Sequence, residues 1–201
     1  MRIINICLGL VLSLAVFANT DVSTPTGRCK DSIGKVLTLV KDQSLSPDIR
    51  WSRIKDVIDN SFDFRSMSQS VLATNWKKAT LGERDKFIDY FSKHLYNTYR
   101  NIIQSYTDEK IRYGKETIDG DRAVVETTVV TKTAEIPVNY KLKNNDGVWY
   151  AYDVEIEGAS LVNKYRNEYG AIFNNEGMDG VLAHIKSTFP TEADVTSSSG
   201  E

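Results

Sequence analysis

Apolar residues in the first half of the chain recur every three or four positions, which is the spacing of one face of an α-helix. The first stripe of this kind runs from Cys29 to Val40 through Ile33, Val36 and Leu37. We therefore predict a helix over about these residues, with its apolar side turned toward the rest of the fold.

Two further helices are predicted before residue 77. Ser46-Pro47 combines a capping serine with a proline at the first helical position, and Trp51, Ile54 and Ile58 form the apolar stripe behind it. The segment 61–76 (SFDFRSMSQSVLATNW) predicts a shorter helix that ends near Trp76.

The longest predicted helix begins at Thr80-Leu81-Gly82-Glu83, which has the spacing of a capping box. Its apolar stripe extends for about seven turns of helix. The stripe consists of Phe87, Phe91, Leu95, Tyr99, Ile102, Ile103 and Tyr106, and Ile88 widens it.

After residue 110 the pattern changes to strict alternation, and this change predicts a sheet. Asp119-Gly120 and Asn145-Asp146-Gly147 are turn signals between the alternating runs. Consecutive strands joined by short turns imply an antiparallel meander that is apolar on one face. Pro137 lies inside one run and predicts an edge position or a bulge, because proline cannot donate to a strand ladder.

The last alternating run assigns its residues to two faces. Tyr150, Tyr152, Val154 and Ile156 fall on the apolar face, whereas Asp153, Glu155 and Glu157 fall on the opposite face. We interpret these carboxylates as a solvated outer surface. The alternative is that they pair with Lys141 or Lys143 on a neighbouring strand.

Two helices, at about Ser160–Phe173 and Met178–Phe189, close the pattern. The prediction is therefore an α+β fold, in which an antiparallel curved sheet of about four to five strands carries helices on one face.

The two ends of the chain are read as segments outside this domain. Residues 1–18 have the apolar run and the small-residue end of a secretory signal peptide, 19–28 is read as a linker and 190–201 as a disordered polar tail. The domain is assigned to 29–189. It keeps one cysteine and so has no internal disulfide, which for an exported protein indicates a bacterial periplasm. The net charge of −2 does not match the basic footprint of a nucleic-acid binder.

Ser160 follows Gly158-Ala159 at a predicted strand-to-helix turn, so it is either a nucleophile or a helix cap. An exported serine hydrolase would use Ser160 with His184. However, a nucleophile elbow needs glycine two residues after the serine, and Val162 occupies that place. Serine is a favoured capping residue, and the sequence favours that role.

No metal site is predicted. His94 and His184 are the two histidines, and neither belongs to a zinc-binding pattern. His94 lies beside the stripe of the longest helix and is predicted to be a half-buried packing residue. The apolar stripes themselves leave two alternatives open, because periodicity does not distinguish a filled core from a hollow one.

The C-terminal stretch Asp153–Val162 (DVEIEGASLV), followed by Tyr165-Arg166, resembles the signature of the MlaC, or toluene-tolerance auxiliary, family. Other pieces agree in order, among them Phe62-Asp63-Phe64 and Trp149-Tyr150. The similarity covers about Cys29 to Phe189. One departure is Ala73, where the family usually has glycine, and this difference affects a helix end.

The resemblance implies a soluble periplasmic phospholipid carrier that needs no cofactor. It implies acyl chains held in an apolar pocket between the curved sheet and the helices, with the headgroup near solvent. The implied partners are an outer-membrane lipoprotein–porin complex and an inner-membrane ABC transporter with its substrate-binding hexamer. A periplasmic adaptor with a packed core, which bridges other proteins, is a further alternative.

With this resemblance, the apolar stripes supply the candidate lipid-binding residues, and Arg166 is a candidate for the lipid phosphate or for an internal ion pair. The lipid-binding candidates are Trp76, Phe91, Leu95, Tyr99, Ile103, Val125, Val129, Val138, Tyr140, Leu142, Tyr150, Tyr152, Val154, Leu161 and Tyr165.

Overall fold

A computed structural model of the chain describes residues 21–106 and 108–189, so the expected signal peptide and the polar tail lie outside the described residues. The helices in this part are α1 (Pro25–Lys41), α2 (Pro47–Ser61), α3 (Phe64–Leu72), the 3-10 helix η1 (Ala73–Lys77), α4 (Leu81–Gln104) and α5 (Leu161–Ser187). The strands are β1 (Lys110–Asp119), β2 (Arg122–Val130), β3 (Glu135–Asn145), β4 (Val148–Ile156) and β5 (Ala159–Ser160).

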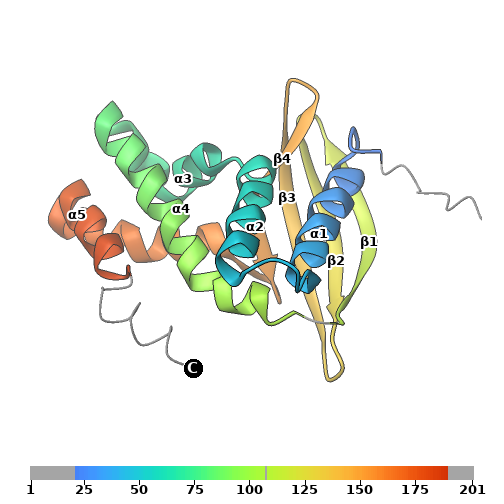
Figure 1. The fold of residues 1–201 in the computed structure, drawn as a ribbon. Coiled ribbons are helices and arrows are strands. Elements are labelled where there is room, and N and C mark those ends of the chain that lie inside the picture. The colour runs from blue at the N-terminus through green and yellow to red at the C-terminus, as the bar shows by residue number, and fades with distance from the viewer. Residues whose placement is uncertain (1–20, 107, 190–201) are drawn as a thin grey trace, which may run out of the picture.

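The five strands form one antiparallel sheet in the order β1-β2-β3-β4-β5. The sheet curves around the helices, all of which lie on one side of it (Figure 1). The predicted α+β class, the antiparallel meander and the one-sided helical layer are therefore confirmed.

The starts of the helices follow their caps. Ser46 and Thr80 cap α2 and α4, and the capping box between Thr80 and Glu83 is complete. Thr24 accepts a hydrogen bond from the backbone N–H of Gly27, and Pro25 is the first residue of α1. Helix α1 therefore begins inside the stretch that we read as a linker, because the cap and the proline together start the helix there.

Pro137 does not lie on an edge strand, because β3 lies between β2 and β4. The last pair between β3 and β4 is Val138 with Ile156, and just beyond it the carbonyl oxygen of Pro137 accepts from the N–H of Glu157 at 2.9 Å. Pro137 therefore lies where the pairing of β3 with β4 ends. The N–H that proline lacks is not needed there, so the interior strand β3 tolerates the proline.

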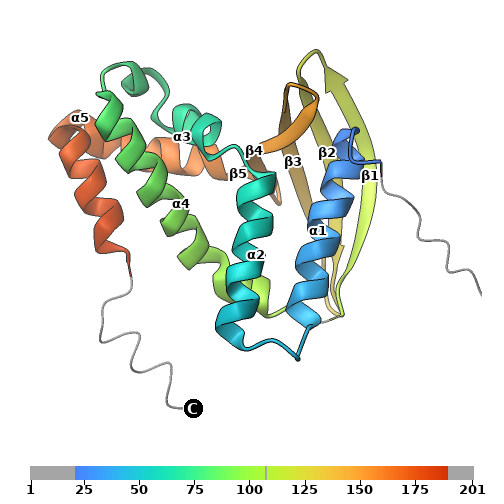
Figure 2. The same cartoon turned by 45° about the horizontal axis from the view of Figure 1, so that its top comes forward.

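The helices form two groups. Helices α1 and α2 lie side by side against the concave face of the sheet, whereas α3, the first half of α4 and α5 form a separate helical layer (Figures 1 and 2). Helix α5 is broken at Gly177, whose φ of 67° is not helical, so the two predicted closing helices are both present. Within residues 21–106 and 108–189, no helix is both long and apolar enough to cross a membrane.

Helix α3 ends at a strained residue. Ala73 has a φ of 49° and a ψ of −121°, and this conformation turns the chain from α3 into η1. At such a positive φ a residue with a Cβ atom is strained by about 1–3 kcal/mol, whereas glycine adopts the conformation freely.

Replacing Ala73 with glycine is expected to raise the free energy of unfolding by about 1 kcal/mol, because relief of the strain exceeds the entropy lost by a more flexible unfolded chain. Urea titration measures this change. Ala171→Gly, at an exposed helical position of α5, is the matched control and should lower stability by about 1 kcal/mol. Equal losses in both variants would contradict the strain at Ala73.

Candidate functional site

An apolar cavity of about 270 Å³ lies between the concave face of the sheet and helices α1, α2 and the second half of α4. A single water needs about 10–15 Å³ of such space, so the cavity has room for about twenty groups of that size. This number is similar to the number of methylene groups in one common acyl chain. The cavity therefore has the dimensions of a binding site for a long alkyl chain.

The walls of the cavity are incompletely packed. Val36, Leu37 and Ile58 line it, and each is only half-buried although each faces the interior of the fold. By contrast, Ile54 on the same helix as Ile58 is 0 % exposed. The alternative of a solidly filled core is therefore wrong for this part of the molecule.

Nine of the fifteen candidate lipid-binding residues line the cavity. They are Leu95, Tyr99 and Ile103 of α4, Val129 of β2, Val138, Tyr140 and Leu142 of β3, Val154 of β4 and Leu161 of α5. Their contact with a lipid remains a prediction, but the structure brings them together around one space.

Three candidates lie in the helical layer instead. Trp76, Phe91 and Tyr165 are buried in one cluster with Phe87 and Tyr169. The rings of Phe91 and Tyr165 meet edge to face with centroids 5.2 Å apart. The stripe of α4 thus serves two purposes, because its first half fills this helical core and its second half faces the cavity.

A bulge in β4 moves two more candidates away from the cavity. Leu142 pairs with Ala151 and Tyr140 with Val154, so two residues of β4, Tyr152 and Asp153, oppose one residue of β3. The strict alternation that we assumed is therefore interrupted, and Ala151 takes the inward place.

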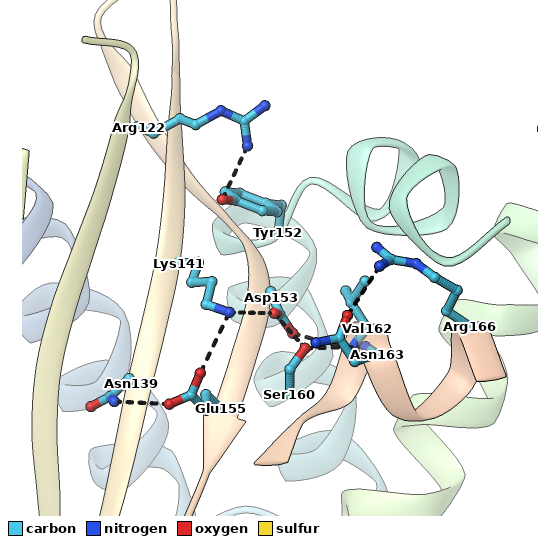
Figure 3. A network of polar contacts seen from close by, with 10 residues as sticks. All are labelled: Arg122, Asn139, Lys141, Tyr152, Asp153, Glu155, Ser160, Val162, Asn163 and Arg166. Carbon is cyan, nitrogen blue, oxygen red and sulfur yellow. Dashed lines mark hydrogen bonds and ion pairs between the residues drawn. The ribbon is translucent and has the colours of Figure 1, made fainter. Parts of the chain in front are cut away.

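Tyr152 lies on the outer face of the sheet, where Arg122 donates to its hydroxyl at 3.1 Å (Figure 3). Tyr150 also lies outside the lining, half-buried, with the guanidinium carbon of Arg28 5.8 Å from its ring centroid. Val125 is fully buried among Cys29, Leu142 and Trp149, behind the wall of the cavity.

Arg166, the candidate for the lipid phosphate, is not part of the lining. Its Nε donates to the backbone oxygen of Ser70 at 2.9 Å, and its Nη1 donates to Oδ1 of Asn163 at 3.1 Å. The first bond joins α5 to α3, and the second lies within α5. Arg166 therefore has a structural role, with a carbonyl and an amide as partners in place of the internal carboxylate that we considered.

Asp153 is the centre of a buried polar network (Figure 3). Its carboxylate accepts from Nζ of Lys141 at 3.2 Å, from the hydroxyl of Ser160 at 2.7 Å and from the N–H of Val162 at 3.1 Å. The side chain is 5 % exposed, so the expected solvated face is wrong for Asp153. The alternative of pairing with Lys141 is confirmed.

This network settles the role of Ser160. Its hydroxyl donates to Asp153 and accepts from the N–H of Asn163 at 3.1 Å, which caps α5. His184 instead bonds Glu168 at 3.0 Å. The helix cap is therefore confirmed, and the Ser160–His184 pair that a hydrolase would need is not formed.

Lys141 holds the network from β3. Burial acts to lower its pKa, but the hydrogen bond and the charge of Asp153, with those of Glu155 3.5 Å away, outweigh burial and raise the pKa of Lys141. The lysine therefore stays protonated and joins β3 to β4. Asp153 in turn joins β4 to the start of α5.

His94 is a packing residue, as predicted. Its ring nitrogens lie 2.7 Å from the hydroxyl of Thr188 and 3.2 Å from that of Tyr165, and burial lowers the pKa of His94. Among residues 21–106 and 108–189, no three His, Cys, Asp or Glu side chains are grouped as a metal site would require.

None of the lipid-binding candidates belongs to α1 or α2, although both helices contribute to the wall. The apolar residues missed include Ile33, Val36 and Leu37 of α1, Trp51, Val57 and Ile58 of α2, and Phe62, Phe64, Tyr106 and Ile111 elsewhere. Most of the helical ones belong to the stripes that predicted these helices. The apolar stripes of α1 and α2 were visible in the sequence. However, a stripe does not show whether it faces a cavity or a filled core.

Cys29 lies in the wall beside this cavity, and burial raises the pKa of its thiol to about 12. Because the thiolate is the reactive form, we expect iodoacetamide at pH 8 to alkylate Cys29 about a hundredfold more slowly than an unstructured cysteine. Peptide mapping by mass spectrometry measures the rate at Cys29 separately from Cys7. Alkylation at the rate of the urea-unfolded protein would contradict the burial.

Comparisons with known proteins agree with this architecture. A sequence profile of the family described as MlaC protein matches residues 30–187. The toluene tolerance protein Ttg2D of Pseudomonas putida is 23 % identical over 180 residues, which cover 85 % of this chain and 84 % of the relative. The intermembrane phospholipid transport system binding protein MlaC of Haemophilus influenzae is 24 % identical over 122 residues, which cover 58 % and 57 % respectively.

A solved structure shares the fold. The phospholipid-binding protein from Ralstonia solanacearum, determined in complex with a phospholipid, superposes with a TM-score of 0.72 at 20 % identity, over 85 % of this chain and 97 % of that chain. At this identity the likeness concerns the fold. Because the family profile spans most of the residues that form the domain, the chain belongs to the MlaC family.

Proposed function

We propose that this protein is a periplasmic phospholipid carrier, which binds an acyl chain in the cavity and moves the lipid between membranes. The observation that carries the proposal is the hollow between the sheet and helices α1, α2 and α4, with its half-buried apolar walls. The names of its relatives, one a phospholipid transport protein and one a phospholipid-binding protein, support the same ligand.

The energetics explain why a carrier is needed. Each methylene withdrawn from water contributes about 0.8 kcal/mol, so a sixteen-carbon tail corresponds to about 12 kcal/mol. A free lipid therefore does not cross an aqueous compartment at a useful rate. A bilayer gives the tail a similar environment to the cavity, so transfer between them is nearly balanced, and direction must come from the partners.

The partners that we propose are an outer-membrane lipoprotein–porin complex and an inner-membrane ABC transporter with its substrate-binding hexamer. Between them the carrier needs neither a cofactor nor a catalytic step. The separation of Ser160 and His184 into two different networks supports binding over hydrolysis.

Lipid extraction tests the proposal. The protein is purified gently from the periplasm of a Gram-negative host, and the extract is analysed by mass spectrometry. We expect diacyl phospholipid in a near-stoichiometric amount. Protein that is consistently free of lipid, and that also fails to take lipid from vesicles, would favour an adaptor that bridges other proteins.

A further inference from the structure

One cation lines the apolar cavity. Of the described residues in the lining, Arg28 alone is basic, and it lies in the first turn of α1. Its Nη2 donates to the backbone oxygen of Asn60 near the end of α2, so the guanidinium is held where these two helices meet. The ring of Tyr150, 5.8 Å from the guanidinium carbon, lies beside it.

Arg28 has no counter-ion in the described part of the chain. No Asp or Glu oxygen of those residues lies within 4 Å of it, whereas Arg65, Arg100 and Arg112 are each paired with a carboxylate. The Nε of Arg28 is also buried without a hydrogen-bond partner. The Nη1 of Arg28 makes no hydrogen bond with the described residues and is not enclosed in this way, so it can donate to an anionic acceptor, which would also supply the missing counter-charge.

The two serine hydroxyls of the lining are already used. Ser61 Oγ lies 2.6 Å from the backbone oxygen of Val57 and 2.8 Å from Ser32 Oγ. If Ser61 donates to Val57, Ser32 donates to Ser61, so both hydroxyl protons are occupied. Arg28, by contrast, keeps guanidinium N–H groups without a partner among the described residues.

The two charged residues of the lining belong to different ends of the fold. Arg28 is in the first turn of α1, and Glu109 is in the link between α4 and β1. Figure 2 shows the start of α1 at one end of the sheet and this link at the other. A negative ligand group is attracted to the end that carries Arg28.

We propose that Arg28 binds the anionic oxyacid head of the ligand, a phosphate ester or a carboxylate, while the attached alkyl chain occupies the cavity. The proposal rests on the proposed function, because it needs an alkyl-chain ligand, and it adds the residue that selects a negative head. Guanidinium is suited to this task, since its fixed N–H groups match the oxygens of phosphate and carboxylate.

The test compares heads on one tail. Delipidated protein is titrated below the micelle concentration with decyl phosphate, decanoate and uncharged decanol, and binding is followed by calorimetry. We expect at least tenfold tighter binding of an anion than of decanol, and Arg28→Gln should remove that preference. Arg28→Lys should restore part of it. Arg53→Gln, an exposed arginine of α2 outside the lining, is the matched control and should bind as the unmodified protein does.

The outcomes separate this proposal from the carrier function. Equal affinity of the unmodified protein for both anions and decanol, or a preference that persists in Arg28→Gln, would overturn the role of Arg28 and leave the alkyl-chain site intact. Absence of binding for all three ligands would overturn the site itself. If the preference does depend on Arg28, the relative affinities for decyl phosphate and decanoate identify the head as a phosphate ester or a carboxylate.

Discussion

Replacing Val36 with tryptophan is expected to weaken the binding of a long-chain phospholipid about a hundredfold. Val36 is a half-buried residue of α1 that faces the cavity, so the larger ring would occupy space meant for the ligand. Displacing about four methylenes from the cavity costs about 3 kcal/mol at ~0.8 kcal/mol each, which is about a hundredfold in affinity. Titration with a fluorescent acyl-chain lipid measures the change.

Lys35→Trp supplies the control for this experiment. Lys35 is the neighbouring residue and is exposed, so the same ring there should leave lipid affinity unchanged. The melting temperature of Val36→Trp should not fall, because the ring fills empty space rather than displacing packed atoms. Unchanged affinity in a folded Val36→Trp protein would mean that the lipid does not use this cavity.

Replacing Asp153 with alanine is expected to lower the free energy of unfolding by about 3–5 kcal/mol. The variant would leave the ammonium of Lys141, the hydroxyl of Ser160 and the N–H of Val162 without their acceptor. Most of this cost comes from the buried Ser160 hydroxyl and Val162 N–H, at about 1–3 kcal/mol for each unsatisfied donor. Lys141 adds a smaller part, because it keeps Glu155 as a partner. Chemical denaturation followed by circular dichroism measures it.

Glu155→Ala is the comparison for Asp153→Ala. Glu155 also contacts Lys141, at 3.5 Å, but its side chain is 27 % exposed, so its loss should cost less than about 1 kcal/mol. The double change Asp153→Ala with Lys141→Met should recover only a small part of the lost stability, because it removes the half-buried ammonium but leaves the Ser160 and Val162 donors without their acceptor. A loss below about 1 kcal/mol in Asp153→Ala would show that water reaches the network.

The sequence predicted the elements and their order, because each depends on local signals. The cap at Thr80, the Ser46-Pro47 start and the turn at Asp119-Gly120 act within a few residues, and each is present in the structure. The start of α1 was placed too late. Its cap at Thr24 was read as part of a polar linker because no apolar stripe precedes Cys29.

The site was harder to predict because it depends on contacts between distant elements. The bulge opposite Lys141 puts Tyr152 on the outer face, and Ser160 and Val162, at the start of α5, enclose Asp153 in a buried network. Similarly, one continuous stripe on α4 serves two environments, and the change occurs near Leu95, which contacts both. No periodicity marks this change, because both environments are apolar.

The positive charge in the cavity was missed for a related reason. Arg166 lies in the family signature and was the natural candidate, but its guanidinium joins two helices. Arg28 lies in a polar stretch with no motif around it. Its position depends on the packing of α1 against α2, where its guanidinium donates to the backbone oxygen of Asn60.

Photo-cross-linking tests most directly whether the lipid lies in this cavity. A phospholipid with a diazirine near the end of one acyl chain is loaded into the protein and irradiated, and the modified peptides are identified by mass spectrometry. We predict modification of residues around Val36-Leu37, Ile102-Ile103 and Val129. Modification confined to the helical core around Phe87 and Tyr169, or to the outer sheet face around Arg122 and Tyr152, would contradict the account.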